Sequence, residues 1–325
     1  MKAAIIGGTR FIGRALVEDL LASGHDVLLI HRGAIDPDPF PELQHVHTDR
    51  TELQNARDAL DAFGPEVLID MVQFSRETAE HVLAALPGAF RRVVISSVDV
   101  YEQYGALNAG RATESVPVDE TGPVRAQRYP YRGQVPGMDD YDKLDVEELY
   151  VAAGGTVCRL PMVYGERDYQ RREEFVLRRV RAGRTQMPFG AGNWLSTMGY
   201  VRDIATGIRL AAERTDVAGE IFNLGEERSL TVEMWARAIL AAAGSDLELA
   251  RVPDAALPED LDLTGAMGQH LLVDCGKSRR VLGCTEMEKN EAIERSVAWH
   301  LENPPKEPNE DFSADDEALK QAAAV

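Results

Sequence analysis

A glycine-rich segment near the start of the chain has the residue types and spacing that hold a dinucleotide phosphate. An apolar run at residues 2–6 leads directly into Gly7-Gly8-Thr9-Arg10-Phe11-Ile12-Gly13 and then into a helical pattern. Glycines let a backbone approach a pyrophosphate closely, and the free N–H groups of the next helix attract its negative charge. We therefore expect cofactor contacts from Gly7, Gly8, Thr9, Arg10, Phe11, Ile12 and Gly13.

Two arginines bear on which dinucleotide is bound. NAD-preferring proteins of this type hold the adenosine ribose with an acid after the second strand, and here that position is Arg32. An arginine offers planar, bidentate donors that suit a 2′-phosphate. Arg10 stands where the middle glycine of the motif would fall and could add a second donor. The pattern favours NADP(H) over NAD(H), although Arg32 could instead only stack on adenine.

Strand-like apolar runs alternate with helical patterns through the first half of the chain. This alternation predicts an α/β fold, a Rossmann-type doubly wound parallel sheet with a smaller, discontinuous C-terminal substrate lobe. We expect strands at residues 2–6, 26–31, 45–48, 67–70, 92–96 and 156–159, and helices at 11–23, 51–63, 75–86, 139–153 and 171–184.

Ligands of such sheets bind beyond the carboxyl ends of the strands. Asp49 follows the third strand, where we expect it to contact the adenine amine, and Asp70 ends the fourth strand as a further cofactor candidate. Val98 and Tyr101 follow the fifth strand and are candidates for substrate contacts.

We expect the chain to divide into three parts. Residues 1–160 form the NAD(P)-binding domain, extended by parts of 199–225, residues 161–302 form most of the substrate lobe, and 303–325 form a surface tail. Residues 102–138 are punctuated by proline and glycine and are expected to form a long loop. Loops of that length inside a compact domain are usually functional or disordered.

The composition excludes several classes of protein. The 325 residues carry a formal net charge of −19, so the chain lacks the basic footprint that a nucleic-acid backbone requires, and we expect no nucleic-acid partner. The chain has no apolar run long enough for a bilayer, and the first strand begins too early for a signal peptide. We expect a cytoplasmic protein with no membrane partner. The three cysteines lack metal-ligand spacing, and we expect no metal.

Six segments, in order, resemble the extended or atypical short-chain dehydrogenase/reductase superfamily, the NAD-dependent epimerase/dehydratase family. The first is the glycine segment that begins at Gly7. The others are Val94-Ile-Ser-Ser-Val-Asp-Val-Tyr101, Tyr141-Asp-Lys-Leu-Asp-Val-Glu147, Arg159-Leu-Pro-Met-Val-Tyr-Gly165, Gly199-Tyr-Val-Arg-Asp-Ile-Ala205 and Ile221-Phe-Asn-Leu-Gly225.

The resemblance implies that a hydride passes between a nicotinamide and a substrate carbon. In the family a tyrosine acts as acid and base, a lysine lowers its pKa and grips the nicotinamide ribose, and a serine or threonine polarises the reacting oxygen. Ser97 and Lys143 match the hydroxyl and the lysine. A phenol with a pKa of about 10 needs such an ammonium nearby before it can act as a base at neutral pH.

The family's tyrosine is absent from its usual place, four residues before Lys143, where Asp139 stands. Residues i and i+4 share a face of a helix whereas i and i+2 do not, so Tyr141 could serve only if the helix begins later than expected. Asp139 could itself be the base, or Tyr129 or Tyr131 could reach in from the long loop. The candidates, in order, are Tyr141, Asp139 and Tyr131.

Two further departures from the family pattern concern the substrate. In the family's nucleotide-sugar enzymes an asparagine contacts the sugar nucleotide and an arginine clamps the diphosphate. Met162 and Ser196 stand at these positions here and are the candidates for substrate contacts. Losing both polar contacts would leave diphosphate charge poorly paired, which disfavours an ordinary UDP-sugar.

These features predict an NAD(P)-dependent epimerase-, dehydratase- or reductase-like oxidoreductase. Its substrate would be a sugar, polyol or related hydroxylated small molecule, with hydride transfer beside Ser97 and Lys143. A catalytically divergent NADP-binding sensor or scaffold is the alternative, and an RNA-binding protein is a weaker one. The resemblance also implies a homodimer joined through a helix bundle that includes the helix after Asp139.

Overall fold

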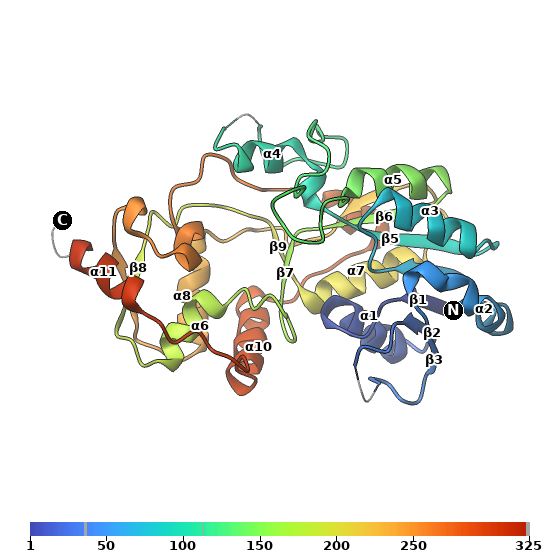
Figure 1. The fold of residues 1–325 in the computed structure, drawn as a ribbon, viewed down its shortest axis with the longest axis horizontal. Helices are drawn as coiled ribbons and strands as arrows, with labels where there is room; N and C mark the ends of the chain where they lie inside the picture. Colours follow the sequence, from blue (N-terminus) through green and yellow to red (C-terminus); the bar gives the residue numbers. More distant parts are fainter. Residues whose placement is uncertain (36–37, 113, 323–325) are drawn as a thin grey trace.

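A seven-stranded parallel sheet forms the core of the N-terminal lobe in the computed structural model, which describes residues 1–35, 38–112 and 114–322 (Figure 1). The strand order is β10-β6-β5-β4-β1-β2-β3. All pairings in this sheet are parallel, which confirms the predicted Rossmann-type fold. The strands are β1 (Lys2–Ile6), β2 (Asp26–His31), β3 (Gln44–His47), β4 (Val67–Asp70), β5 (Arg91–Ser97), β6 (Thr156–Leu160) and β10 (Ile221–Asn223).

The strand order reverses between β1 and β4, and sheets of this kind bind ligands in the crevice beyond the carboxyl ends at such a point. Helices cover both faces, because successive side chains of a strand point to opposite sides. Ile5 faces a core shared with α1 (Phe11–Ala22) and α7 (Val201–Glu213). Ile6 faces the other side, which is covered by a 3₁₀ helix (Arg50–Ala56), α2 (Arg57–Phe63) and α3 (Arg76–Ala85). On that side, α5 (Lys143–Ala152) lies next to α3.

The C-terminal lobe lies beside the sheet and is built from shorter elements (Figure 1). A two-stranded parallel pair, β7 (Met162–Tyr164) with β9 (Met198–Tyr200), stands between the lobes, and a second pair, β8 (Gln186–Phe189) with β11 (Glu248–Arg251), lies within the smaller one. Its helices are α6 (Glu174–Arg181), α8 (Val232–Ala242), α10 (Lys289–Glu302) and α11 (Ser313–Ala322), and α9 (Gly276–Leu282) packs against β10 and α7. Among the described residues, no helix combines the length and the apolar character needed to cross a bilayer.

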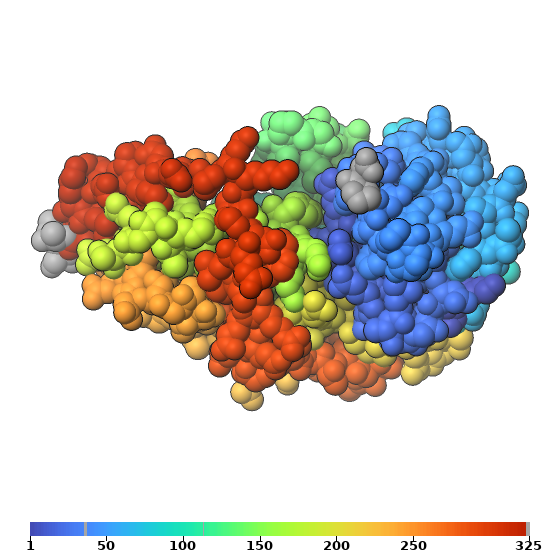
Figure 2. Space-filling view, turned by 90° about the horizontal axis from the view of Figure 1, so that it is seen from below, coloured from blue at the N-terminus to red at the C-terminus, as the bar shows by residue number. Residues whose placement is uncertain are grey.

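The end of the chain differs from the expected surface tail. α11 packs against β8 and β11, and the C-terminal segment lies over the smaller lobe in the space-filling view (Figure 2). The carboxylate of Asp315 has 0% exposure and accepts two hydrogen bonds of 2.6 Å from Arg179, which is also fully buried. A second carboxylate, from Asp260, lies 2.8 Å from the same guanidinium. A desolvated arginine requires such partners, so α11 is an integral part of the lobe.

Several element boundaries differ from those expected. The loop expected at residues 102–138 contains a helix, α4 (Glu102–Asn108), and the helix expected at 171–184 is the shorter α6. The helix expected from Asp139 begins only at Lys143, because Asp142 has extended backbone and its side chain accepts a 3.0 Å hydrogen bond from the Leu144 N–H. This is an N-cap, and the acids before it belong to a turn instead of to the first helical turn.

We predict that Asp315→Ala lowers the free energy of unfolding by about 3 kcal/mol, because it leaves a buried guanidinium underpaired. Urea denaturation of the purified protein measures this change. Asp316→Ala is the matched control on the same helical turn: its side chain is 56% exposed, so its removal should cost less than about 1 kcal/mol. Equal effects of the two substitutions would contradict the role assigned to the buried pair.

Candidate active site

The glycine segment forms a tight turn at the carboxyl end of β1. Gly7 and Gly8 have φ values of 102° and 88°, a region open to glycine and strained for other residues. A Cβ on Gly13 would lie 2.8 Å from the Cα of Gly8, so the first turn of α1 sits directly on this turn. Arg10 is the N-cap of α1 but makes no side-chain capping bond, which leaves the first N–H groups of the helix for an anion. The residues present therefore fit the pyrophosphate of a dinucleotide.

Two of the residues expected at the adenosine end are exposed beside this turn. Arg10 and Arg32 both have exposed side chains at the carboxyl ends of β1 and β2. Asp49 is exposed too, and its Oδ1 accepts a 3.0 Å hydrogen bond from the Thr51 N–H. Hydrogen bonds from Thr51 hold the pKa of Asp49 below its usual value, and the nearby charge of Arg32 lowers it further. Arg32 and Asp49 thus lie on neighbouring strand ends.

Asp70 differs from the role expected of it. Its side chain has 0% exposure, and its carboxylate accepts hydrogen bonds from Gln73 Nε2 at 2.6 Å, from the Tyr150 hydroxyl at 2.7 Å and from the Val72 N–H at 3.2 Å. A carboxylate so enclosed offers no oxygen to a bound cofactor. Its hydrogen bonds to Val72 and Gln73 instead hold the loop after β4 in place.

The late start of α5 places Tyr141 and Lys143 together. Tyr141 directly precedes the extended cap residue Asp142 and lies outside the helix, so the Tyr141 and Lys143 side chains are not held on opposite faces of a helix. The Asp142 N–H donates to the Phe74 carbonyl oxygen at 2.8 Å, which ties this extended stretch to the loop after β4. Both Tyr141 and Lys143 are buried.

The Tyr141 hydroxyl meets a carboxylate that no sequence pattern singled out. It donates a 2.7 Å hydrogen bond to Oδ2 of Asp99, which lies two residues after Ser97 in the turn that follows β5. Burial raises the pKa of Tyr141 well above its usual value, the Asp99 carboxylate raises it further, and a hydrogen bond involving Ser97 opposes both effects. Ser97, Asp99 and Tyr141 therefore form one hydrogen-bonded group.

Asp99 is itself unusual. It is 5% exposed, and its Oδ1 is buried without a hydrogen-bond partner among the described residues. Burial raises the pKa of its carboxyl, against the hydrogen bond from Tyr141 and the positive charges of Arg125 and Lys143. Buried carboxylates in stable structures normally have their oxygens satisfied. A carboxyl with one free oxygen and a raised pKa has the properties of an acid or base.

Lys143 lies under the same group. Its Nζ donates to the carbonyl oxygens of Ile95, at 2.9 Å, and Gln73, and it stands 5.9 Å from the centre of the Tyr141 ring. Burial lowers the pKa of Lys143 to about 8, although the charges of Asp99 and Asp70 oppose the shift. Two of its three donors are fixed by backbone, so Lys143 is held rigidly at the carboxyl end of β5.

Of the other two acid–base candidates, Tyr131 reaches the Asp99 carboxylate and Asp139 does not. Tyr131 reaches in from the long loop: its hydroxyl lies 3.2 Å from Oδ2 of Asp99 and 2.8 Å from the hydroxyl of Tyr104. Asp139 lies on the surface, where its carboxylate accepts a 2.9 Å hydrogen bond from the Gly133 N–H. Asp139 is therefore not brought to the site, because the turn that holds it precedes the real start of α5.

A buried ion pair fixes the loop that carries these tyrosines. Arg125 is 2% exposed; its Nη2 lies 2.7 Å from the Asp142 carboxylate and its Nε donates to the Asp99 carbonyl oxygen at 2.9 Å. Arg128 adds a second 2.7 Å bond to Asp142. One carboxylate thus caps α5 and joins the loop to the backbone of Asp99, so the positions of Tyr141 and Asp99 are set together.

Of the two candidates after β5, Tyr101 cannot contact substrate directly. It is 0% exposed, its hydroxyl donates a 2.7 Å hydrogen bond to the Asn223 side chain, and the Arg159 guanidinium lies over its ring. Val98 is partly exposed in the turn beside Ser97 and Asp99. Tyr101 therefore supports the floor of the site while Val98 lies nearer its surface.

A cavity of about 540 Å³ in the C-terminal lobe has the size of a small-molecule site. Met162 and Ser196, the two residues at the family's polar positions, both line it. Met162 lies two residues beyond Leu160, which pairs with Ser97 across β6 and β5, so this wall begins close to the catalytic candidates. The remaining apolar lining includes Phe175, Trp194, Met198, Leu230, Val232, Trp235 and Leu263.

The three arginines of this cavity are already paired. Arg171 donates a 2.7 Å hydrogen bond to the Asn303 carbonyl oxygen, Arg172 lies 3.0 Å from the Asp168 carboxylate, and Arg178 lies 3.0 Å from Asp260. Within the described part of the chain, the cavity therefore has no unpaired arginine in its lining. An apolar wall with neutralised cations suits an apolar or aromatic group better than a diphosphate.

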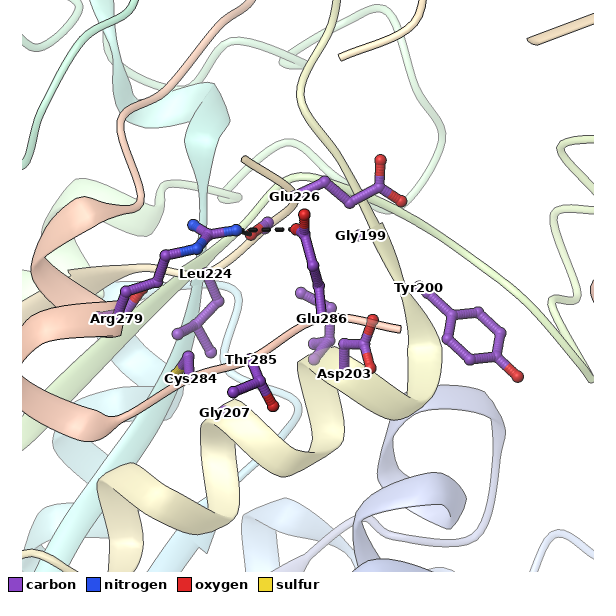
Figure 3. Close-up of a pocket in the computed structure, with 13 residues that line it drawn as sticks. Gly199, Tyr200, Asp203, Gly207, Leu224, Glu226, Arg279, Cys284, Thr285 and Glu286 are labelled. Atoms are coloured by element: carbon purple, nitrogen blue, oxygen red, sulfur yellow. Dashed lines mark hydrogen bonds and ion pairs between the residues drawn. The ribbon is translucent and has the colours of Figure 1, made fainter. Parts of the chain in front are cut away.

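A second cavity, of about 20 Å³, holds no more than a water molecule (Figure 3). It lies at the start of α7, where the Arg279 side chain points to Glu286 at 2.8 Å. Burial raises the pKa of Asp203, another lining residue, to about 6. Tyr200 points away from this cavity in Figure 3, and its hydroxyl bonds to Glu166 at 3.0 Å. The cavity is too small for substrate.

We predict that Asp99→Asn becomes progressively more stable, relative to the original protein, as pH rises from 4 to 7.5. Because the pKa of folded Asp99 is raised, the native carboxyl ionises at a higher pH than the unfolded one, which titrates at about 3.9, and over the interval between the two pKa values the native state binds more protons. The original protein therefore loses stability as pH rises through this interval, and the variant does not. Urea denaturation at the two pH values measures the difference.

Asp49→Asn is the control, because the pKa of Asp49 is shifted in the opposite direction. The stability of Asp49→Asn relative to the original protein should therefore stay nearly constant between pH 4 and 7.5, because the folded and unfolded Asp49 carboxyls differ in protonation mainly below about pH 3.9. A relative stability of Asp99→Asn that stays constant with pH would contradict the buried state assigned to this carboxyl.

Comparisons with known proteins bear on the family and the fold of the chain. Residues 3–225 match the sequence model of the NAD dependent epimerase/dehydratase family. The chloroplast stem-loop binding protein of 41 kDa b from Arabidopsis thaliana is 28% identical over 75% of the chain, and the match spans only 63% of that protein's length. An uncharacterized protein, y4nL, of Sinorhizobium fredii (strain NBRC 101917 / NGR234) is 27% identical over 70% of the chain and 67% of its own length.

Solved structures share the fold at lower identity. A UDP-glucose 4-epimerase superimposes with a TM-score of 0.72 at 15% identity, over 94% of this chain and 98% of its own. The dTDP-glucose 4,6-dehydratase of Bacillus anthracis str. Ames, in complex with NAD, gives 0.70 at 14% identity, over 94% and 97%. The NAD complex of the UDP-glucose 4-epimerase from Thermus thermophilus gives 0.69 at 20%, over 93% and 100%.

Proposed function

Because the chain belongs to the NAD dependent epimerase/dehydratase family, we propose that it is a nicotinamide-dependent oxidoreductase whose acid–base group is the Tyr141–Asp99 pair. The observation that carries this proposal is the 2.7 Å hydrogen bond from the Tyr141 hydroxyl to a buried carboxylate, beside Ser97 and above Lys143. The cofactor, when bound, would supply the hydride acceptor or donor.

The pair divides the acid–base work between two groups. A phenol whose pKa is raised by burial and by a neighbouring carboxylate is a poor phenolate base on its own. Tyr141 can instead take the proton of a substrate hydroxyl as it passes its own proton to Asp99 along the existing hydrogen bond. In the reverse direction Asp99 returns the proton by the same path, so the two oxygens act as one base and one acid.

In this proposal Ser97 polarises the reacting oxygen of the substrate, and Lys143 positions the groups around it. The Ser97 hydroxyl, already in contact with Tyr141, would donate to the substrate oxygen on which negative charge develops. The Lys143 ammonium holds the strand end and favours the ionised form of Asp99. Ser97 ends β5 and Lys143 begins α5, and these are rigid elements suited to hold a reacting group in place.

We propose a hydroxylated substrate that carries an apolar or aromatic group. The support is the cavity of about 540 Å³, which is lined by Met162, Trp194 and Trp235 and whose arginines are paired within the protein. A nucleoside diphosphate would bring two charged groups to a wall without free cations. A binding-only role as a redox sensor is the competing function, and it predicts cofactor binding without turnover.

A substrate panel tests this function. Free sugars, polyols, sugar nucleotides and hydroxylated aromatic compounds are each incubated with the protein and NADP⁺, and absorbance of the reduced cofactor is recorded. We expect turnover with hydroxylated aromatic or lipophilic compounds and little with sugar nucleotides. Tight binding of NADPH with no turnover across all classes would favour the sensor instead.

With a reacting compound in hand, Asp99→Asn and Tyr141→Phe should each lower kcat by about 10²- to 10⁴-fold, the usual contribution of a positioned acid or base. Steady-state kinetics measure the loss. Tyr129→Phe is the control, because the Tyr129 hydroxyl bonds to Asp145 at 3.3 Å and not to Asp99. Full activity in Asp99→Asn would exclude the relay, and full activity in Tyr141→Phe would move the role to Tyr131.

We further propose that NADP(H) is preferred over NAD(H). The support is the pair of exposed arginines, Arg10 after β1 and Arg32 after β2. NAD-binding proteins of this fold class carry an acid at the position of Arg32. A 2′-phosphate between them would accept charge-assisted hydrogen bonds from two guanidinium groups.

Arg32→Asp should weaken NADPH binding by about ten- to a hundredfold, because it removes charged hydrogen bonds and adds a like charge. Binding of NADPH and NADH is measured by fluorescence titration. Arg57→Asp, which makes the same charge change on exposed α2, is the control. An unchanged ratio of the two affinities in Arg32→Asp would show that Arg32 does not read the 2′-phosphate.

A further inference from the structure

Three of the seven histidines of the chain meet at one edge of the sheet. β3 is the edge strand of the sheet (Figure 1). His31, at the end of β2, is the direct partner of His47 in the parallel register. His45 lies two residues before His47, so both side chains point to the same face. Asp38, from the loop that joins the two strands, completes the group.

The donor atoms of these four residues converge. His31 Nε2 lies 2.8 Å from His45 Nδ1, and His47 Nε2 lies 2.7 Å from an Asp38 carboxylate oxygen. The other carboxylate oxygen is 3.9 Å from His31 Nε2. One donor atom can be chosen from each residue so that all four lie within 4.8 Å of one another. No salt bridge to a lysine or arginine of the described chain joins the Asp38 carboxylate.

We propose that His31, Asp38, His45 and His47 form a binding site for a divalent transition metal, with Zn²⁺ as the best match. Zinc takes four ligands in a tetrahedron, with nitrogen and oxygen donors at about 2.0–2.2 Å. Donors in such a tetrahedron are about 3.4 Å apart, within the range of separations seen here. Three imidazoles and one carboxylate are ligands that suit zinc, whereas calcium and magnesium favour all-oxygen sites.

The surroundings of the ligands support this assignment. His45 Nε2 lies 2.9 Å from the Phe40 carbonyl oxygen, an arrangement that fixes the tautomer with Nδ1 free to coordinate. His31 and His45 side chains are 6% and 9% exposed, whereas His47 is 52% exposed, so the group is enclosed on one side and open to an entering ion on the other.

One contact must change when a metal binds. The Gly33 N–H now donates to His31 Nδ1 at 3.1 Å, and coordination through Nε2 would require Nδ1 to carry the proton. Gly33 is exposed and has a positive φ of 68°, so the peptide before it can turn without steric cost. His45, His47 and Asp38 coordinate without such a change.

The site would link a metal to the cofactor turn. Arg32 directly follows His31, and the loop continues to Phe40, whose ring lies under the Arg14 guanidinium of the first turn of α1 at 5.4 Å. A metal bound to both strands and to Asp38 would hold this loop against the sheet. The loop that presents Arg32 would then be fixed before any nucleotide arrives.

Titration with Zn²⁺ of protein freed of any affinity tag, measured by calorimetry, tests the proposal without cofactor or substrate, so its outcome is independent of the proposed activity. We expect one equivalent of Zn²⁺ to bind. His47→Gln and Asp38→Asn should each weaken this binding by at least about tenfold. His81→Gln, which removes a histidine from α3, should leave it unchanged.

Cobalt provides a second readout that a folding defect cannot imitate. Co²⁺ in a four-coordinate site absorbs strongly in the visible range, and this absorption should appear with the original protein and be displaced by Zn²⁺. This absorption should be lost in His47→Gln. Because His47 is exposed, its substitution should not unfold the protein, and thermal melting checks that the fold is kept. Absence of stoichiometric Zn²⁺ binding, or binding unaffected in both His47→Gln and Asp38→Asn, would overturn the proposal.

Discussion

The carboxylate of Asp142 is the point on which the candidate site depends. It caps α5, pairs with buried Arg125 and bonds to Arg128, so it fixes a helix start and a long loop at once. The two guanidinium groups hold the pKa of this carboxyl below its usual value, although burial opposes them. Because the helix begins at Lys143 and not four residues earlier, Tyr141 lies before it and its hydroxyl reaches Asp99.

The arrangement inverts the usual electrostatic preparation of a catalytic tyrosine. An ammonium beside a phenol lowers its pKa, but the closest charged neighbour of the Tyr141 hydroxyl is a carboxylate, which raises it. Lys143 sits under the ring and binds two carbonyl oxygens. In the proposed mechanism, the negative charge next to the phenol makes Asp99 the group that gains a proton. Burial of that charge reduces native stability. Active sites commonly retain such a local loss of stability for function.

The sequence was sufficient to predict the parallel sheet and the tight glycine turn after its first strand. The strands β1, β2 and β4 begin and end where expected, because each is built on a short continuous apolar run. The predicted start of α5 at Asp139 is wrong, because a run of acids is compatible both with the first turn of a helix and with a loop that precedes the helix. Only the tertiary partners of Asp142 decide between them.

Other site features could not be read from local pattern. Asp99 lies between Ser97 and Tyr101 in the family motif. Its only local signal is an acid between two valines just after a strand. The convergence of His31 with His47 depends on strand register, which spacing along the chain does not reveal. Asp70 and Tyr101 stand at or soon after the carboxyl ends of strands, where ligand-binding residues are expected. Their side chains are nevertheless buried in the core.

The buried pair between Arg179 and Asp315 has a consequence for the order in which the molecule can assemble during synthesis. Arg179 is made early in the smaller lobe, whereas its partner on α11 follows 136 residues later. β10 likewise joins the sheet beside β6 only after the intervening sixty residues or so have been made. The strands β1 to β6 can therefore form a nascent N-terminal unit, whereas the Arg179 guanidinium has only the Asp260 carboxylate as its partner until α11 has been made. The smaller lobe is thus the part of the molecule whose buried ion pairs are completed last.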